Sequence, residues 1–260
     1  MPRAFEDAAD ELGTSQQRGH TAHVLPLEWS RIEPAEGQWN YHELERYGQA
    51  IEELTKNSLA SFVTLHQFAN PRWFADRGGW LAGDSAELFA RYADVAAQHL
   101  GDRVDFWITI TEPTILVAKG FIEGSWPPFS RKPFSAWRAS RNLTAAHKGA
   151  YRAIHRHVPR ALVGGAHHLQ HAEDSLRPVL KTSDFIGAID SGSPSEEITR
   201  RLLGLKQYKK PIYFTENKPV DTPETLRAIE TAQKGGADVR GYFHAAHPAG
   251  SLYTALASLR

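Results

Sequence analysis

Short apolar stretches alternate with amphipathic helical stretches along nearly the whole chain, and this alternation constrains the fold more than any other feature. Two of the apolar stretches, residues 61–65 and 211–215, are almost continuously hydrophobic, as strands are when helices cover both faces of a parallel sheet. Strand–helix alternation over about 250 residues favours a (β/α)8 TIM barrel in the α/β class, with an open doubly wound sheet second. Strands are expected over residues 20–27, 60–66, 104–110, 160–166, 183–188, 211–215 and 238–244.

Apolar residues spaced three and four positions apart predict helices between these strands. The clearest stripes run from Leu44 to Leu54, from Leu88 to Leu100 and from Leu143 to Ile154. Asp84 and Glu87 stand three residues apart before the second stripe, which is the spacing of a capping box. We therefore expect that helix to begin at Asp84.

Three more helices complete the expected pattern. One has Ser193 as its cap and Pro194 at its first position, one begins at Thr222–Pro223, and the last covers residues 249–259. The N-terminal part of the chain contributes a helix-like stretch at residues 5–12 and no strand. The count is therefore seven strands, so either an eighth strand is hidden or the barrel is abbreviated, with its first strand missing.

A barrel without one strand has two open edges, which here are expected to be strands 20–27 and 238–244. Unpaired edges promote pairing with another chain unless something covers them. We expect either that a terminal segment plugs the gap or that a second copy covers it. The homodimer is the favoured outcome, because residues 1–19 contain only Phe5 and Leu12 as large apolar groups.

Composition excludes several classes of function. The chain has 30 Lys+Arg against 30 Asp+Glu, which argues against electrostatic binding of nucleic acid. It has no cysteine, which removes disulfides, thiolate catalysis and Cys-type zinc sites. No phosphate-binding glycine motif follows a strand, no apolar stretch approaches about 20 residues, and no signal peptide is apparent. We expect one domain over residues 1–260, no cofactor, no membrane contact and a cytoplasmic enzyme.

Two of the expected strands end in a glutamate, Glu112 before Pro113 and Glu216 before Asn217. Barrel enzymes place their chemistry at the carboxyl ends of the strands, and an acid buried there is costly unless it is paired or functional. Two acids converging on one mouth are the parts of acid–base or acid–nucleophile chemistry. From the residues alone, strand-end carboxylates bound by arginine or backbone amides remain an equal alternative.

At these positions the sequence resembles glycoside hydrolase family one, the retaining β-glucosidases. The segment around Glu112 is similar to the Thr-Phe-Asn-Glu-Pro motif of that family, and the segment around Glu216 is similar to its Ile-Thr-Glu-Asn-Gly motif. The likeness extends in order and spacing over most of residues 20–245. It includes the segments 27–34, 63–65 with 70–74, 78–80, 120–121 with 126–128, and 238–243.

The resemblance implies a role for each acid: Glu112 is the acid/base and Glu216 the nucleophile. A retaining reaction then requires their carboxyl groups to lie about 5–5.5 Å apart. We also expect burial and the charge of Glu216 to raise the pKa of Glu112, as a general acid needs.

The sequence departs from the family at several sugar-binding positions. Thr111 replaces the asparagine that binds the sugar 2-hydroxyl, and Gln67 replaces a sugar-binding histidine, with His66 beside it. Val24 stands where the family has an arginine that braces the nucleophile. Residues 244–250 differ from the family's tryptophan-rich segment, and its N-terminal strand is absent. The carboxylate pair is thus retained while much of the sugar-binding set is replaced.

The remaining candidates are histidines and aromatic residues. His167 and His168 are adjacent on an expected strand, so they should point to opposite faces, and we expect no metal site although the chain has thirteen histidines. Loop aromatics either pack in the core or form a rim for a sugar ring or flat apolar substrate, whereas Trp29 and Trp107 are expected to be structural. We expect Arg31 to pair with a buried carboxylate or a surface acid. The expected substrate-binding residues are His66, Gln67, Thr111, Trp126, His168 and His244.

Three functions remain open at this stage. The first is a retaining glycosidase that uses the two acids on a small-molecule glycoside. The second is a repurposed barrel that uses the same acids for proton transfer on a non-sugar substrate, because hydroxyl recognition depends on the polar groups that are replaced here. The third is a non-catalytic binding or scaffold protein, for which the retention of both acids has no reason.

Overall fold

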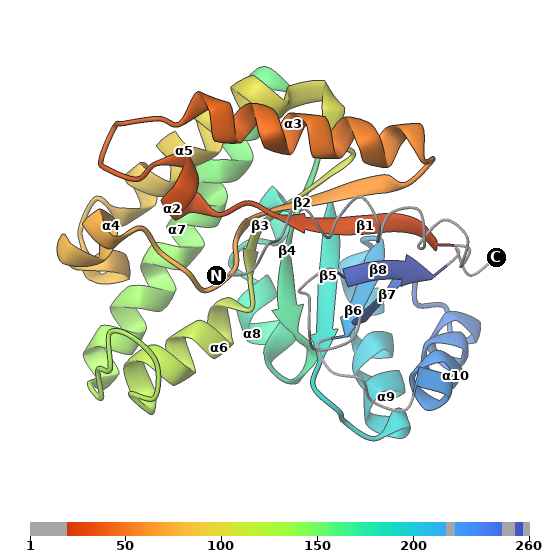
Figure 1. Cartoon of the computed structure of the whole chain (residues 1–260). Helices are drawn as coiled ribbons and strands as arrows, with labels where there is room; N and C mark the ends of the chain where they lie inside the picture. The colour runs from red at the N-terminus through yellow and green to blue at the C-terminus, as the bar shows by residue number, and fades with distance from the viewer. Residues whose placement is uncertain (1–19, 217–221, 246–252, 257–260) are drawn as a thin grey trace.

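The computed structural model describes residues 20–216, 222–245 and 253–256 and shows a closed barrel of strands surrounded by helices (Figure 1). Seven strands run parallel to one another in sequence order, so their carboxyl ends lie at the same end of the barrel. They are β1 (His20–Pro26), β2 (Ala60–His66), β3 (Phe106–Thr111), β4 (Leu162–His168), β5 (Phe185–Asp190), β6 (Ile212–Glu216) and β7 (Val239–Ala245).

Helices of the described residues cover the outside of the barrel. The long ones are α3 (Tyr41–Lys56), α5 (Ser85–Leu100), α7 (Pro133–His157), α9 (Ser195–Leu205) and α10 (Thr222–Lys234). Shorter helices follow several strands: α2 (Trp29–Ile32), α4 (Arg72–Asp76), α6 (Pro113–Val117) and α8 (Ala172–Leu176). Figure 1 shows α9 and α10 together on the far side of the barrel from α3 and α5.

The hydrophobic pattern located the parallel strands well. All seven expected strands are confirmed, with starts that differ by at most two residues, and the three apolar stripes lie on α3, α5 and α7. Asp84 is the N-cap residue of α5, as expected, but the capping box is wrong: among the described residues its side chain caps no backbone N–H and instead pairs with the guanidinium of Arg77. At α9, Pro194 is the N-cap residue and the helix begins at Ser195. The helix-like stretch at residues 5–12 lies outside the described residues.

The gap in the parallel barrel is filled by residues near the C-terminus. A short strand, β8 (Tyr253–Leu256), pairs antiparallel with β1 on one side and with β7 on the other. The expected helix over residues 249–259 is therefore wrong in its described part, and the expected plug is present. The two expected edge strands, β1 and β7, are the ones that β8 covers.

This closure changes our expectation for the oligomeric state, because β8 removes the open edges that favoured a dimer. We now expect the protein to be a monomer in solution. Light scattering with size-exclusion chromatography measures this directly. A dimer that persists on dilution to the lowest detectable concentration would contradict the prediction.

The barrel interior is filled by side chains that point inward from six strands. This interior cluster consists of Ala22, Val24, Phe62, Ile108, Ala166, Phe185, Ile189 and Phe243. The rings of Phe62 and Phe106 stack at a centroid distance of 4.1 Å. Gly164 makes room for a further ring, since a Cβ atom there would lie 2.8 Å from the ring of Phe185. Among the described residues, the barrel interior is thus a packed core, and a site is expected at its mouth.

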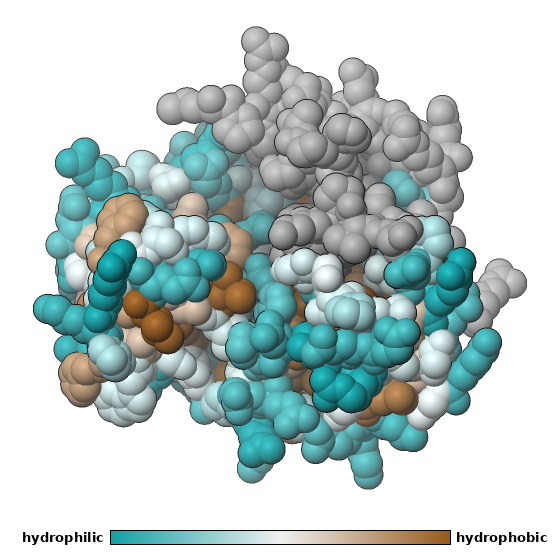
Figure 2. Space-filling model, turned by 90° about the horizontal axis from the view of Figure 1, so that it is seen from below, coloured by the Kyte–Doolittle hydropathy of each residue, from teal (hydrophilic) through white to brown (hydrophobic). Residues whose placement is uncertain are grey.

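Two further cores lie outside the barrel. One joins β2 and β3 to α3, α5 and α7, and the other joins β5 and β6 to α9 and α10. On the face shown in Figure 2, hydrophobic residues form small separate areas among hydrophilic ones. Among the described residues, no helix is both long and apolar enough to cross a membrane.

Candidate active site

Glu112 is held at the carboxyl end of β3 by its backbone. Its N–H donates a hydrogen bond of 2.7 Å to the carbonyl of Ala166 on β4. Its φ of 48° and ψ of 53° are left-handed, a conformation that non-glycine residues adopt rarely and at a cost. Pro113 then starts α6, and the side chain of Glu112 is 5% exposed. A strained, buried acid at the mouth of a barrel is typical of a functional position.

Glu216 is the last residue of β6, and its Cα pairs with that of Asp190 on β5. Because β3 and β6 are parallel strands of one barrel, the backbones of both glutamates lie at its carboxyl end. The side chain of Glu216 lies outside the described residues. The expected separation of the two carboxyl groups therefore stays a prediction.

Thr111 and His168 lie on the inner side of the barrel. Thr111 is buried and pairs with Ala166, and His168 pairs with Ile189; both partners belong to the interior cluster. His168 Nε2 lies 3.1 Å from the hydroxyl of Ser191. Burial lowers the pKa of His168 below its usual value, so the ring is neutral at pH 7 and offers a hydrogen bond rather than a charge.

His167 points the opposite way, as expected for adjacent strand residues. Its Nδ1 lies 2.9 Å from the hydroxyl of Ser175 on α8, outside the barrel. Among the side chains that the structure describes, no group of three or more His, Asp or Glu is placed to hold a metal ion.

His66 and Gln67, at the end of β2, have different surroundings. His66 is buried, with its Nε2 3.0 Å from the Asn70 side chain and its ring edge-on to Trp80 at a centroid distance of 5.2 Å. Burial lowers the pKa of His66 to about 4. These contacts place His66 in the core outside the barrel, so the structure does not favour it as a substrate-binding residue. Gln67, one residue later, is half-buried and remains available.

The aromatic candidates divide between core and rim. Phe74, Trp80 and Phe121 are buried, as are the two tryptophans expected to be structural, Trp29 and Trp107. Trp126 is half-buried and meets the ring of Phe68 edge-on at 5.0 Å, which joins the loops after β2 and β3. Phe129 is exposed.

His244 lies on β7, and its side chain is outside the described residues.

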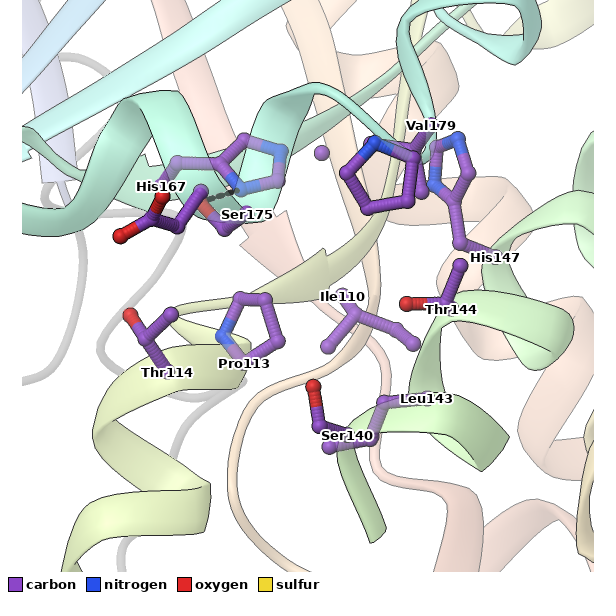
Figure 3. Close-up of a pocket in the computed structure, with 13 residues that line it drawn as sticks. Ile110, Pro113, Thr114, Ser140, Leu143, Thr144, His147, His167, Ser175 and Val179 are labelled. Carbon is purple, nitrogen blue, oxygen red and sulfur yellow. Dashed lines mark hydrogen bonds between the residues drawn. The ribbon is translucent and has the colours of Figure 1, made fainter. Parts of the chain in front are cut away.

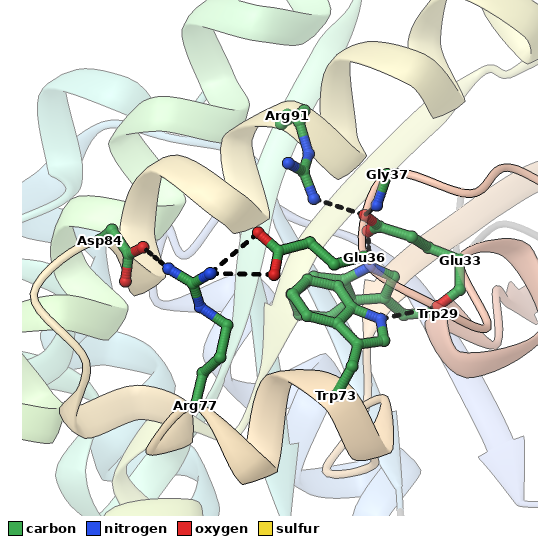
Figure 4. Close-up of polar contacts among 8 residues, drawn as sticks. All are labelled: Trp29, Glu33, Glu36, Gly37, Trp73, Arg77, Asp84 and Arg91. Atoms are coloured by element: carbon green, nitrogen blue, oxygen red, sulfur yellow. Dashed lines mark hydrogen bonds and ion pairs between the residues drawn. The ribbon is translucent and has the colours of Figure 1, made fainter.

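Sequence reasoning missed a buried carboxylate, Glu33, that fixes the loop after β1 (Figure 4). Its side chain is 0% exposed. It accepts hydrogen bonds of 2.8 Å from the indole N–H of Trp29 and the backbone N–H of Gly37, and it pairs with the guanidinium of Arg91. These contacts hold the loop after β1 in its conformation.

The expected pairing of Arg31 with a buried carboxylate is confirmed, because its Nε lies 2.9 Å from the buried Glu43.

Comparison with known proteins agrees with this architecture. The sequence model of glycosyl hydrolase family 1 matches residues 6–183. The chain is 33% identical over 145 residues to a cytosolic beta-glucosidase of Cavia porcellus, which covers 55% of this chain and 31% of the relative. It is 30% identical over 156 residues to beta-glucosidase A of Thermotoga maritima, and this alignment covers 60% of this chain and 35% of the relative. The chain thus spans about a third of the length of these relatives.

Solved structures show the same fold. A beta-glucosidase from Thermotoga maritima in complex with deoxynojirimycin superposes with a TM-score of 0.82 at 20% identity, covering 92% of this chain and 76% of that one. A beta-glycosidase from Pyrococcus horikoshii superposes with a TM-score of 0.80 at 22% identity, and the match covers 92% of this chain and 74% of that one.

Proposed function

Because this chain belongs to glycosyl hydrolase family 1, we propose that it hydrolyses a β-glycosidic bond with retention of configuration. In the first step, the Glu216 carboxylate attacks the anomeric carbon while Glu112 protonates the departing glycosidic oxygen. In the second step, Glu112 removes a proton from water, the resulting hydroxide attacks the anomeric carbon, and Glu216 leaves as a carboxylate. The net reaction consumes one water and uses no cofactor.

The placement of Glu112 carries this proposal. The acid is buried at the mouth on a left-handed backbone between β3 and α6, and the backbone of Glu216 ends another parallel strand of the same barrel. A buried carboxyl group near a second acid keeps its proton at higher pH than an exposed one. Such a group is suited to act as a general acid.

We propose Gln67, Thr111, Trp126, His168 and His244 as substrate-binding residues. Thr111 and His168 lie on the inner side of the barrel, and the others lie at or after strand ends. His66 is left out because its ring is enclosed by core aromatics. The set has fewer strong hydrogen-bonding groups for sugar hydroxyls than the family resemblance implies.

This reduced set leads to a prediction about simple substrates. We expect turnover of aryl β-glucosides with a kcat/KM below roughly 10⁴ M⁻¹s⁻¹, the lower end of the usual range for enzymes. Missing hydrogen bonds to hydroxyl groups cost transition-state stabilisation. Initial rates on a panel of aryl β-glucosides, galactosides and fucosides measure this. An efficient glucosidase would show that the replaced residues do not limit the site.

The same panel tests the carboxylate pair. We expect Glu112→Gln to lower kcat/KM by about 10²- to 10⁴-fold on substrates with poor leaving groups, and less where the leaving group needs no proton. Glu216→Gln should remove turnover of every substrate, because no covalent intermediate can form. Glu230→Gln, an exposed position on α10, is the matched control and should keep full activity. Activity that survives in Glu216→Gln would contradict the assignment.

One observation favours a second candidate. Val24 belongs to the apolar interior cluster, at the position where the resemblance expects an arginine that braces the nucleophile. A site without that brace suits proton transfer on a non-sugar substrate such as a flat apolar compound. If the unmodified protein turns over no glycoside on the panel, that result would favour this second function.

A further inference from the structure

A cavity of about 120 Å³ lies outside the barrel, behind the strand that carries Glu112 (Figure 3). It is enclosed by β3, β4, the start of α6, α7 and the segment containing α8. Its buried floor includes Ile110, Leu143, His147 and His167, and its exposed rim includes Ser140 and Asp174. The cavity is far larger than the roughly 10–15 Å³ that a single water requires.

Two polar atoms at this cavity have no hydrogen-bond partner among the described residues. They are His167 Nε2 and Thr114 Oγ1, both buried. The His167 side chain is 3% exposed. Figure 3 shows His167 and Thr114 on one side of the cavity, opposite His147 and Val179. Buried polar atoms without partners are costly, so their presence together at one cavity points to a ligand that supplies the missing bonds.

The hydrogen bonds of His167 define what its free nitrogen can do. The Ser175 hydroxyl lies 3.0 Å from the carbonyl of His171 and 3.2 Å from that of Ala172, so its single proton is donated to the backbone. Ser175 must then accept from His167 Nδ1–H at 2.9 Å. Nε2 therefore carries a lone pair and accepts. Burial lowers the pKa of His167 to about 3, which keeps the ring neutral.

A glycine keeps the space in front of this acceptor open. Gly165 lines the cavity on β4, and a Cβ atom there would lie 2.9 Å from His167 Nε2. Any larger residue would occupy the position from which a donor approaches. The acceptor is thus unsatisfied, and it borders the cavity with no side chain at position 165 in front of it.

From these features we propose that the cavity binds a small neutral polyol, with one hydroxyl donating to His167 Nε2 and another bonding to Thr114 Oγ1. Ser140 and Thr144 supply further hydroxyls, while Ile110 and Leu143 contact the carbon chain. An anion is disfavoured because Nε2 offers a lone pair and Asp174 a negative charge. The site is separate from the barrel mouth, since Ile110 belongs to the core outside the barrel, and it does not depend on the proposed reaction.

Titration of the ¹⁵N-labelled full chain with glycerol, followed by ¹H–¹⁵N NMR, tests the proposal. We expect saturable shifts confined to residues 110–114, 140–147 and 165–179, and none with inorganic phosphate at the same concentration. Thr114→Val keeps the side-chain shape and should weaken binding roughly twofold to tenfold, as expected for one lost hydrogen bond. Gly165→Ala should weaken it more than tenfold by covering Nε2. Thr55→Val, on α3, is the matched control and should bind as the unmodified chain does.

Several results would overturn the site. Shifts that grow linearly without saturation mean that only water fills the cavity. Equal affinity in Thr114→Val and the unmodified chain, or saturable binding of phosphate, would equally reject the proposal. Because glycerol binding is measured without any glycoside, failure here leaves the proposed hydrolysis untouched, and failure of hydrolysis leaves this site standing.

Discussion

Lowering the pH from 7 toward 5 is expected to unfold this protein, because four histidines are buried in their neutral form. Burial lowers the pKa of His23, His66 and His147 to about 4 and that of His167 to about 3. In the unfolded chain each titrates near 6.5. Between these values the unfolded state binds protons that the folded state does not, so stability is lost as the pH falls below about 6.5.

The expected size of this effect is large. Four protons bound only by the unfolded state lower the free energy of unfolding by roughly 5 kcal/mol per pH unit near pH 5. From pH 7 to pH 5 the loss adds up to roughly 7 kcal/mol. Since a domain has only about 5–15 kcal/mol in total, we expect most of the stability to be lost by about pH 5. His147 illustrates the cause: its ring nitrogens lie 2.6 Å from the Thr109 hydroxyl and 2.7 Å from the Thr182 carbonyl. No acid faces it closely enough to form a hydrogen bond in the described structure.

Urea denaturation at half-unit steps from pH 7.5 to pH 5 measures the slope. Replacing one buried histidine, as in His66→Phe, should reduce the slope by about one proton, or roughly 1.4 kcal/mol per pH unit. His42→Gln, at an exposed position on α3, should leave the slope unchanged. A free energy of unfolding that stays constant between pH 7 and pH 5 would show that these rings are protonated in the folded state.

Replacing Glu33 is the second change with a large expected effect. Glu33→Ala should lower the free energy of unfolding by about 3–5 kcal/mol, because each donor left without its charged acceptor costs about 1.5–3 kcal/mol. The buried indole N–H of Trp29 and the N–H of Gly37 both lose their acceptor. Arg91 also loses its partner, although its half-exposed guanidinium can turn to water.

The neighbouring Glu36 provides a matched control, visible in Figure 4. Its carboxylate pairs with Arg77, and both side chains are more than a third exposed. Exposed ion pairs contribute little, so Glu36→Ala should cost less than about 1 kcal/mol. Glu33→Gln keeps an acceptor for Trp29 and should fall between the two. Urea denaturation at pH 7 measures the free energy of unfolding of each variant. Equal losses in Glu33→Ala and Glu36→Ala would show that the buried contacts of Glu33 stabilise the protein no more than the exposed ion pair does.

Local patterns predicted much of the fold because the determinants of strands and helices lie close together in the sequence. Continuous apolar stretches such as residues 61–65 identify strands covered on both faces, and stripes such as Leu44 to Leu54 identify helices packed on one face. The opposite orientations of His167 and His168 follow from the two-residue period of a strand in the same way. Glu112 and Glu216 could be placed at strand ends because each directly follows an apolar stretch that predicts a strand.

What the tertiary structure decided depends on partners far apart in the chain. Residues 253–256 form a strand instead of a helix because the open edges of β1 and β7 offer backbone groups that only the closed barrel brings together. The side chain of Asp84 pairs with Arg77 instead of capping α5, because Arg77 is close to it in space. His66 turns into the core because Trp80 and Phe89 surround it there. Hydrophobic periodicity is fixed by neighbours in sequence, whereas pairing, burial of charge and cavities are fixed by which surfaces meet, and those exist only once the chain has folded.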